Sequence, residues 1–130
     1  MPMPHLVEYS EASPEIQALY DEIKQGLNMT DVPNFWKCLA NHPQTALRVH
    51  ELAKSVMAPG ALDPATKELI YLAVAVMANC DICVRVHTKL AQNKGVTAEQ
   101  IGEAFAVISL AAGNAALANS WRVPIDEQFK

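Results

Sequence analysis

The stretch DPATKELIYLAVAVMANCDICVRVHTKLAQNKG, residues 63–95, decides the fold because it predicts two consecutive helices joined by a short turn. Asp63 is placed to cap the first helix, with a proline in its first turn. The apolar run at residues 69–78 indicates a core helix, since ten residues are too few to cross a bilayer, which takes about 20. The second helix is expected from Cys80 to about Asn93, with Gly95 as the stop.

Helix signals also dominate the rest of the chain, and no alternating strand pattern of useful length is present. The sequence predicts an all-α fold of six or seven helices in a single domain over residues 1–130. The helix that begins at Pro43 is expected to bury Leu47, Leu52 and Val56. Two other expected helices are a segment capped by Ser13 and a short one at about residues 35–40. A last helix opens with the capping-box spacing of Thr97 and Gln100, and it either continues past Gly113–Asn114 or breaks there.

Composition narrows the class of protein. The 130 residues are enough for one hydrophobic core, and 51% of them are hydrophobic while only 18% are charged. This is apolar for a monomer, so part of the apolar surface is expected to be buried between subunits, with Trp121 at such a contact. The net charge of −4 and the lack of a basic cluster argue against nucleic-acid binding. The first 15 residues do not resemble a signal peptide, and we expect a cytoplasmic protein with no membrane partner.

Two cysteines and a histidine lie on one stripe of the second helix. Cys80, Cys83 and His87 are related as i, i+3 and i+7, and the i, i+3 spacing brings Cβ atoms to about 5–6 Å, from which a modest adjustment allows a disulfide. A helix that starts near Cys80 favours a thiolate through its dipole and free N–H groups, and His87 is placed to exchange the thiol proton. Asp81 opposes the thiolate by charge repulsion, and Arg85 points to another face.

Glu68 is the other candidate for proton transfer. If the two helices fold back on each other at Asn79, Glu68 returns to roughly the level of His87, and a relay Glu68–His87–Cys83 becomes possible. Burial among leucine and valine side chains is expected to raise the pKa of the carboxyl toward neutrality and so suit it to shuttle protons.

These residues carry a resemblance to a known family. Glu68, Cys80, Cys83 and His87 fill the pattern E-x11-C-x2-C-x3-H, which resembles the AhpD-like alkylhydroperoxidase group of the carboxymuconolactone decarboxylase family. The similarity covers roughly residues 40–115, with the motif at its centre. It implies an all-helical domain that assembles as trimers or hexamers.

The resemblance also implies a reaction. Cys83 would be the thiolate that attacks a peroxide, deprotonated through Glu68 and His87, and the resulting sulfenic acid would condense with Cys80, the more accessible thiol. A dithiol donor would then reduce the disulfide, so no metal, haem, flavin or nicotinamide cofactor is expected. One position departs from the pattern, because some peroxidase members carry a histidine immediately before the second cysteine, where this chain has Ile82.

Two alternatives stay open. The first is a decarboxylase or lactone-processing enzyme on the same scaffold, with His87 and Glu68 as acid and base. The second is a non-enzymatic redox sensor or a metal-binding module, in which zinc would take the cysteine pair and His87 as ligands and needs a fourth. That fourth ligand would come from Glu68, His50, Cys38 or a neighbouring subunit; on its own, His50 is expected to be partly exposed and Cys38 to be a buried free thiol.

Overall fold

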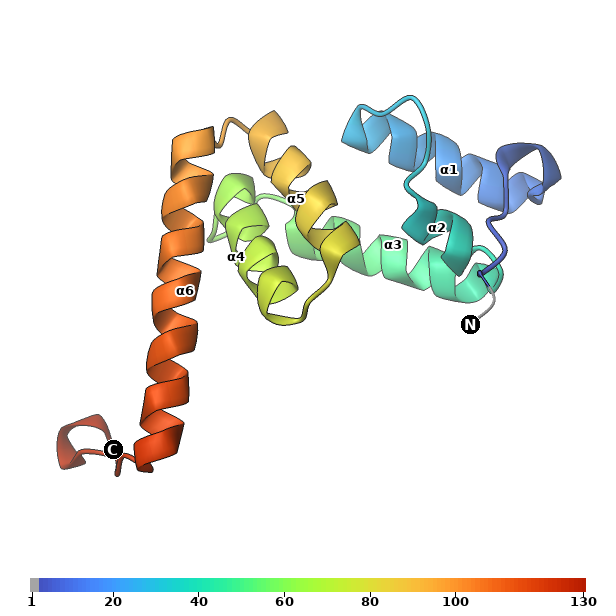
Figure 1. Cartoon of the computed structure of the whole chain (residues 1–130). Helices are drawn as coiled ribbons and strands as arrows, with labels where there is room; N and C mark the ends of the chain where they lie inside the picture. Colours follow the sequence, from blue (N-terminus) through green and yellow to red (C-terminus); the bar gives the residue numbers. More distant parts are fainter. Residues whose placement is uncertain (1–2) are drawn as a thin grey trace. The chain divides into compact units, whose positions relative to one another are not determined.

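The computed structural model describes residues 3–130, and within them the regular structure is entirely helical (Figure 1). Six α-helices are joined by short loops, which confirms the predicted all-α class. Their bounds are α1 Pro14–Leu27, α2 Asn34–Leu39, α3 Pro43–Met57, α4 Pro64–Met77, α5 Asp81–Asn93 and α6 Ala98–Trp121, with 3₁₀ turns η1 at Tyr9–Glu11 and η2 at Glu127–Phe129.

The chain divides into two compact units, Met1–Ala58 and Pro59–Lys130. Each unit has a hydrophobic cluster of its own. All four candidate site residues belong to the second unit: Glu68, Cys80, Cys83 and His87. The expectation of a single domain over residues 1–130 stays a prediction.

The first unit is built on the apolar face of α1. Ser13 caps this helix by accepting a hydrogen bond from the N–H of Ile16, as expected. The helix buries four side chains and ends at Asn28 in the left-handed region, with φ of 51°. The side chains that α1 buries are Ile16, Leu19, Tyr20 and Ile23.

Helix α3 differs from its sequence prediction in the face that it buries. Leu52 is 64% exposed and Val56 54% exposed, so the expectation that both are buried was wrong, and Leu47 is only half-buried. His50, expected to be partly exposed, is instead 7% exposed, with its ring edge-on to that of Trp36 at 5.6 Å between centroids. The apolar spacing of a helix does not tell which of its faces meets a neighbour, and here an imidazole lies on the buried face.

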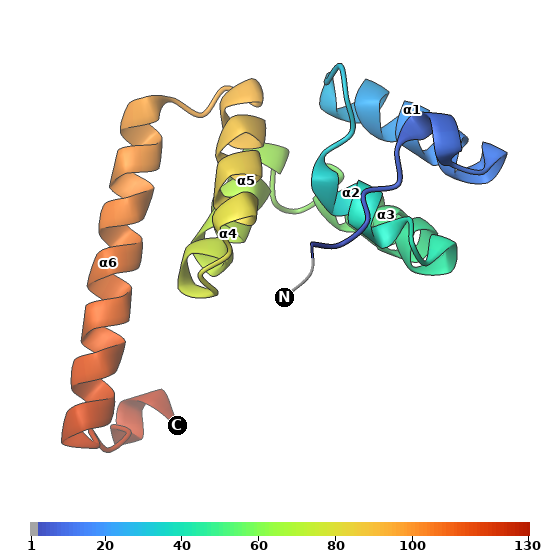
Figure 2. The same ribbon diagram turned by 45° about the vertical axis from the view of Figure 1, so that its right-hand side comes forward.

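In the second unit α4 and α5 form an antiparallel hairpin, as Figures 1 and 2 show. The chain reverses at Asn79, which has a φ of 55°. Leu72 from α4 and Ala91 from α5 are fully buried between these helices and α6, together with Ile101 at the start of α6. The chain thus meets the condition set for the relay, a fold-back at Asn79, and the N-terminal end of α4 lies beside the C-terminal end of α5.

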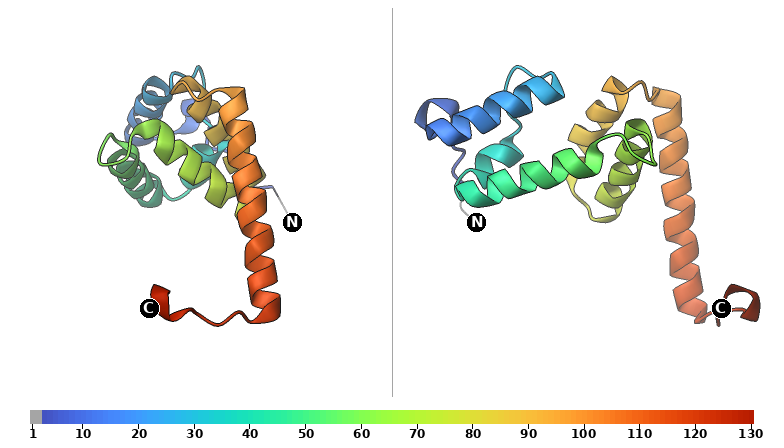
Figure 3. Two further views of the ribbon diagram at one scale, coloured as in Figure 1. Left: turned by 90° about the vertical axis from the view of Figure 1, so that its left-hand side faces the viewer. Right: turned by 180° about the vertical axis from the view of Figure 1, so that it is seen from behind.

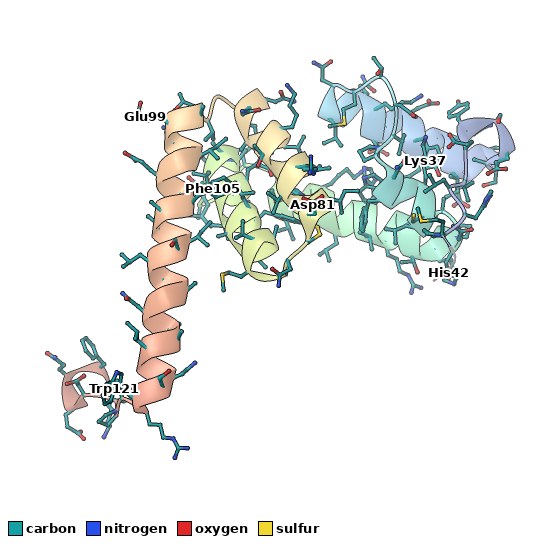
Figure 4. All side chains as sticks on the ribbon, viewed as in Figure 1. Lys37, His42, Asp81, Glu99, Phe105 and Trp121 are labelled. Carbon is teal, nitrogen blue, oxygen red and sulfur yellow. A yellow bond between two sulfur atoms is a disulfide. The ribbon has the colours of Figure 1, made fainter. Side chains whose placement is uncertain are left out.

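Helix α6 begins with the predicted capping box of Thr97 and Gln100 and continues through Gly113 without a break (Figure 3). Figure 4 shows Phe105 on the side of α6 nearest α4, whereas Trp121 lies at the far end of the helix. The second half of α6 packs against no other helix of its unit, and Trp121 is 79% exposed. By length and composition alone α6 is able to cross a membrane, with a mean hydropathy of 1.5 and only 6% of that window buried.

Candidate functional site

Glu68 is a buried carboxylate in the second turn of α4. Asp63 caps this helix by accepting a hydrogen bond from the N–H of Thr66, which fixes where the helix starts. Glu68 then falls four residues before Leu72 on the inner face, and it is 1% exposed. A carboxylate is rarely buried to this extent unless it is paired, so its partners define a site.

The cysteine pair lies at the start of α5. Cys80 is the N-cap residue, and its sulfur accepts a hydrogen bond from the N–H of Cys83 at 3.3 Å. The two residues form a disulfide with their Cα atoms 5.2 Å apart, and both are half-buried. The first turn of the helix therefore holds both sulfurs where its free N–H groups and dipole favour negative charge.

His87 joins Glu68 to the helix that carries the cysteines. Its Nδ1 lies 2.6 Å from Oε2 of Glu68, and the ring is mostly buried. Tyr71, one turn after Glu68 on α4, stacks on the imidazole with ring centroids 3.5 Å apart and an interplanar angle of 18°. His87 follows Cys83 by four residues on the same helix, so their side chains are neighbours on one face.

The structure adds Lys94, which the sequence reasoning did not single out. Its Nζ lies 2.5 Å from Oε1 of Glu68, the oxygen that His87 does not use. Lys94 follows His87 by seven residues, so it continues the stripe that starts at Cys83 and includes the buried Ala91. That spacing places Lys94 on the stripe, but it does not show whether the ammonium group turns inward.

The pKa of Glu68 is lowered from its ordinary value of 4.5. Burial is the largest influence and acts to raise it, but the hydrogen bonds from His87 and Lys94, with the charges of both, outweigh that effect. The expectation of a pKa raised toward neutrality was therefore wrong, because it counted the burial and missed the second cation. Glu68 is held as a carboxylate at neutral pH and serves as a hydrogen-bond acceptor.

Three side chains near the cysteines are exposed to solvent. Asp81 and Arg85 form an exposed ion pair of 2.9 Å one turn apart on α5. Ile82, at the position where some family members carry histidine, is 46% exposed. Among residues 3–130, neither the ion pair nor Ile82 forms a hydrogen bond or ion pair with Glu68 or His87.

The remaining cysteine and histidines belong to the first unit. Cys38 and His50 belong to the first unit, where Cys38 is a half-buried free thiol, less buried than expected. His42 caps α3 by accepting a hydrogen bond from the N–H of Thr45, and His5 pairs with Glu11 at 2.8 Å. No group of three or more His, Cys, Asp or Glu side chains among residues 3–130 is arranged to hold a metal ion.

Comparison with known proteins places this geometry in a family. The sequence profile described as "Carboxymuconolactone decarboxylase family" matches residues 43–126. A solved structure of the alkylhydroperoxidase AhpD core from Rhodospirillum rubrum superposes with a TM-score of 0.92 at 40% identity, over 99% of this chain and 97% of that one. The chain therefore belongs to the carboxymuconolactone decarboxylase family, and within it the chain is AhpD-like, as the sequence motif indicated.

Curated relatives agree with this placement but match only in part. The chain is 45% identical over 69 residues to "Uncharacterized protein 4 in cox locus" of Paracoccus denitrificans, a match that covers 53% of this chain and 62% of that protein. It is 29% identical over 99 residues to alkyl hydroperoxide reductase AhpD of Solibacter usitatus, covering 76% of this chain and 56% of the relative. The chain thus spans between about half and three fifths of the length of these relatives.

Proposed function

We propose that this protein is a thiol oxidoreductase that reduces a peroxide through a reversible Cys80–Cys83 disulfide. The observation that carries the proposal is the 2.6 Å contact of His87 with the buried Glu68, on the helix whose first turn contains the disulfide. A hydrogen-bonded imidazole and carboxylate beside a redox-capable sulfur pair supply what peroxide reduction needs: a thiolate, a proton donor for the leaving oxygen and a second thiol.

The contact with Glu68 also orients the imidazole. When Nδ1–H donates to the carboxylate, the lone pair of Nε2 remains free to accept a proton. Because Cys83 lies one helical turn before His87, its thiol is the natural proton donor. The carboxylate then stabilises the imidazolium that forms, in the way that a buried acid orients the histidine of other nucleophilic sites.

The cycle balances without any further group. The thiolate of Cys83 attacks one peroxide oxygen, the O–O bond breaks, and the departing alkoxide takes the proton held by His87. The sulfenic acid of Cys83 is then attacked by the sulfur of Cys80, which forms the disulfide and releases water. A small dithiol reduces that disulfide through a mixed disulfide and is itself oxidised, so one peroxide and one dithiol give an alcohol, water and the donor disulfide.

Thiol titration tests the proposal directly. The fully reduced chain has three thiols, at Cys38, Cys80 and Cys83. One equivalent of peroxide is expected to remove two of them in the wild type and in the matched control Cys38→Ser, whereas Cys83→Ser is expected to form no intramolecular bridge. Retention of all three thiols in wild type overturns the proposal.

Turnover separates an enzyme from a redox sensor and from the decarboxylase alternative. With excess dithiothreitol, a catalytic amount of wild-type protein is expected to consume many equivalents of peroxide, and Cys83→Ser is expected not to turn over. Cys80→Ser is expected to be slower than wild type, because the donor must then reduce the Cys83 sulfenic acid directly. A single oxidation without turnover indicates a sensor. Lactone or decarboxylase turnover that survives both cysteine substitutions favours the acid–base alternative with His87 and Glu68.

We further propose that α6 packs against other copies of the chain in a trimer or hexamer. Its outward apolar side chains are more exposed than a monomer usually tolerates in one helix: Val107 at 65%, Leu110 at 64% and Leu117 at 59%. Sedimentation equilibrium is expected to give a multiple of the 14.2 kDa chain mass, and Leu110→Glu to reduce it. The control Glu99→Gln, at the start of the same helix, is expected to leave the mass unchanged, and a monomeric wild type contradicts the assembly.

A further inference from the structure

The carboxylate of Glu68 has a different partner on each oxygen. Oε2 faces Nδ1 of His87 at 2.6 Å, and Oε1 faces Nζ of Lys94 at 2.5 Å. The Glu68 side chain is 2% exposed, whereas that of Lys94 is 33% exposed. Both partners come from α5. His87 is mostly buried, whereas Lys94 lies at the end of the helix and is partly open to solvent.

The fold of α5 explains why both partners reach one carboxylate. His87 and Lys94 are seven residues apart, which places them two turns, or about 10 Å, apart on one face. Between them lies Ala91, which is fully buried and has only a methyl side chain. Lys94 is the C-cap residue of α5, and Gly95, with a φ of 90°, turns the chain away directly after it.

The chemistry of the two partners differs in a way that matters for proton transfer. An imidazole gains and loses charge during a catalytic cycle. When it is neutral it still donates a hydrogen bond, but it no longer compensates the negative charge of a buried carboxylate. An ammonium group keeps its charge throughout. With Lys94 on one oxygen, the negative charge of Glu68 stays compensated while the proton of the imidazole comes and goes.

We propose that Lys94 is a positioning residue that keeps the Glu68 carboxylate ionised and directed at Nδ1 of His87 through both charge states of the imidazole. The inference rests on the proposed function of the site, but the contact that it concerns can be measured without turnover. His87 and Lys94 are the two charged partners of Glu68 among residues 3–130, both from α5, and Tyr71 of α4 covers the imidazole.

The first measurement is the ¹³C NMR titration of the glutamate carboxyl groups in the full-length protein, with the Glu68 signal assigned by its loss in Glu68→Gln. Lys94→Met is expected to raise the pKa of Glu68 by at least about one unit, because a charged partner within hydrogen-bond distance shifts a carboxyl by about that much. Lys94→Arg is expected to restore most of the difference. The control Lys89→Met removes an exposed lysine of the same helix and is expected to change nothing.

The second measurement is the pH dependence of kcat/KM for peroxide with excess dithiothreitol. In Lys94→Met the acid limb of the profile is expected to move to higher pH together with the Glu68 titration. On that limb a shift of one unit lowers kcat/KM by up to about tenfold, and Lys94→Arg is expected to recover it. A Glu68 pKa that is unchanged in Lys94→Met overturns the inference. So does a Glu68 shift that leaves the pH profile in place, because the contact is then structural only.

The two proposals fail in distinguishable ways. A wild-type protein without peroxide turnover removes the proposed function, while the NMR titration still decides whether Lys94 holds Glu68 in its ionised form. Lys94→Gln is the second neutral variant, used if circular dichroism shows that Lys94→Met does not fold, and the same shift of the Glu68 titration is expected for it.

Discussion

Lys37 in the first unit and Glu68 in the second are both buried charges held between two partners, yet only one of them belongs to a candidate active site. The ammonium of Lys37 lies 2.9 Å from Oε2 of Glu8 and 2.9 Å from Oδ2 of Asp31, and the Lys37 side chain is 6% exposed. Geometry and burial alone therefore do not tell which of the two charge clusters belongs to a candidate active site.

The partners make the difference. Both carboxylates that hold Lys37 are more than half exposed, so water reaches them directly. One partner of Glu68 is instead a mostly buried imidazole, a side chain that can both accept and donate a proton, and it shares a helix with the cysteine pair. A buried ion pair by itself is thus weak evidence of function, and a titratable partner next to a reactive group is stronger evidence.

The largest expected effect contrasts the two buried charges in turnover. Glu68→Gln removes the negative charge that orients and stabilises the imidazole, and kcat/KM for peroxide is expected to fall by about a hundredfold or more. Lys37→Met, which removes an equally buried charge from the first unit, is expected to leave kcat/KM within about twofold. Steady-state peroxide consumption at pH 7 measures both variants. An equal loss in the two would contradict a catalytic role that is particular to Glu68.

The next effect concerns stability as a function of pH. The pKa of folded Glu68 lies below its ordinary value of 4.5, so the carboxylate contributes stability above pH 4.5 that is lost as the pH falls through the lower, folded value. The difference in unfolding free energy between wild type and Glu68→Gln is therefore expected to shrink on acidification below pH 4.5. Urea unfolding of the oxidised proteins at fixed concentration measures it, and a difference that grows on acidification contradicts the assigned direction.

Much of this site was predictable from the sequence because local rules govern it. Asp63 and Cys80 mark the starts of two helices, Asn79 marks the turn between them, and a hairpin of known length fixes which residues face each other. If the chain reverses at Asn79, Glu68 and His87 therefore face each other. The spacing of residues along two helices carries this information without any knowledge of the core.

What escaped prediction depends on packing rather than on spacing. Lys94 lies at a helix end where lysine is common for electrostatic reasons, so nothing in the sequence distinguishes an ammonium turned inward from one in water. The burial of His50 and the exposure of Leu52 depend on which face of α3 meets its neighbours. The direction of the Glu68 pKa was mistaken for the same reason, since it depended on the unseen lysine.

A smaller effect is expected from the ring that covers the imidazole. Tyr71→Leu removes the stack on His87, a contact worth about 0.5–1.5 kcal/mol, and kcat/KM is expected to fall about two- to tenfold. Tyr71→Phe keeps the ring and is the matched control, expected to retain wild-type activity. Equal losses in the two variants would assign the effect to the hydroxyl group and would contradict a role for the stacking on His87. The Lys37 cluster has no such ring among its ion-pair partners, so this test addresses what is particular to the Glu68 site.

The smallest effect is the stability change on removing the buried ammonium of the first unit. Lys37→Met keeps the aliphatic stem, and the two exposed carboxylates regain water, so the free energy of unfolding at pH 7 is expected to change by less than about 1 kcal/mol. The hydrogen bonds that Lys37 donates to Glu8 and to Asp31 raise its pKa above 10.5. Whatever stability Lys37 contributes is therefore present below pH 10.5 and is lost as the pH rises through the folded value. Urea unfolding of wild type and Lys37→Met at neutral and alkaline pH measures both statements. A destabilisation of several kcal/mol at pH 7 would mean that the Lys37 cluster organises the first unit, and that the two buried charges are more alike than their partners indicate.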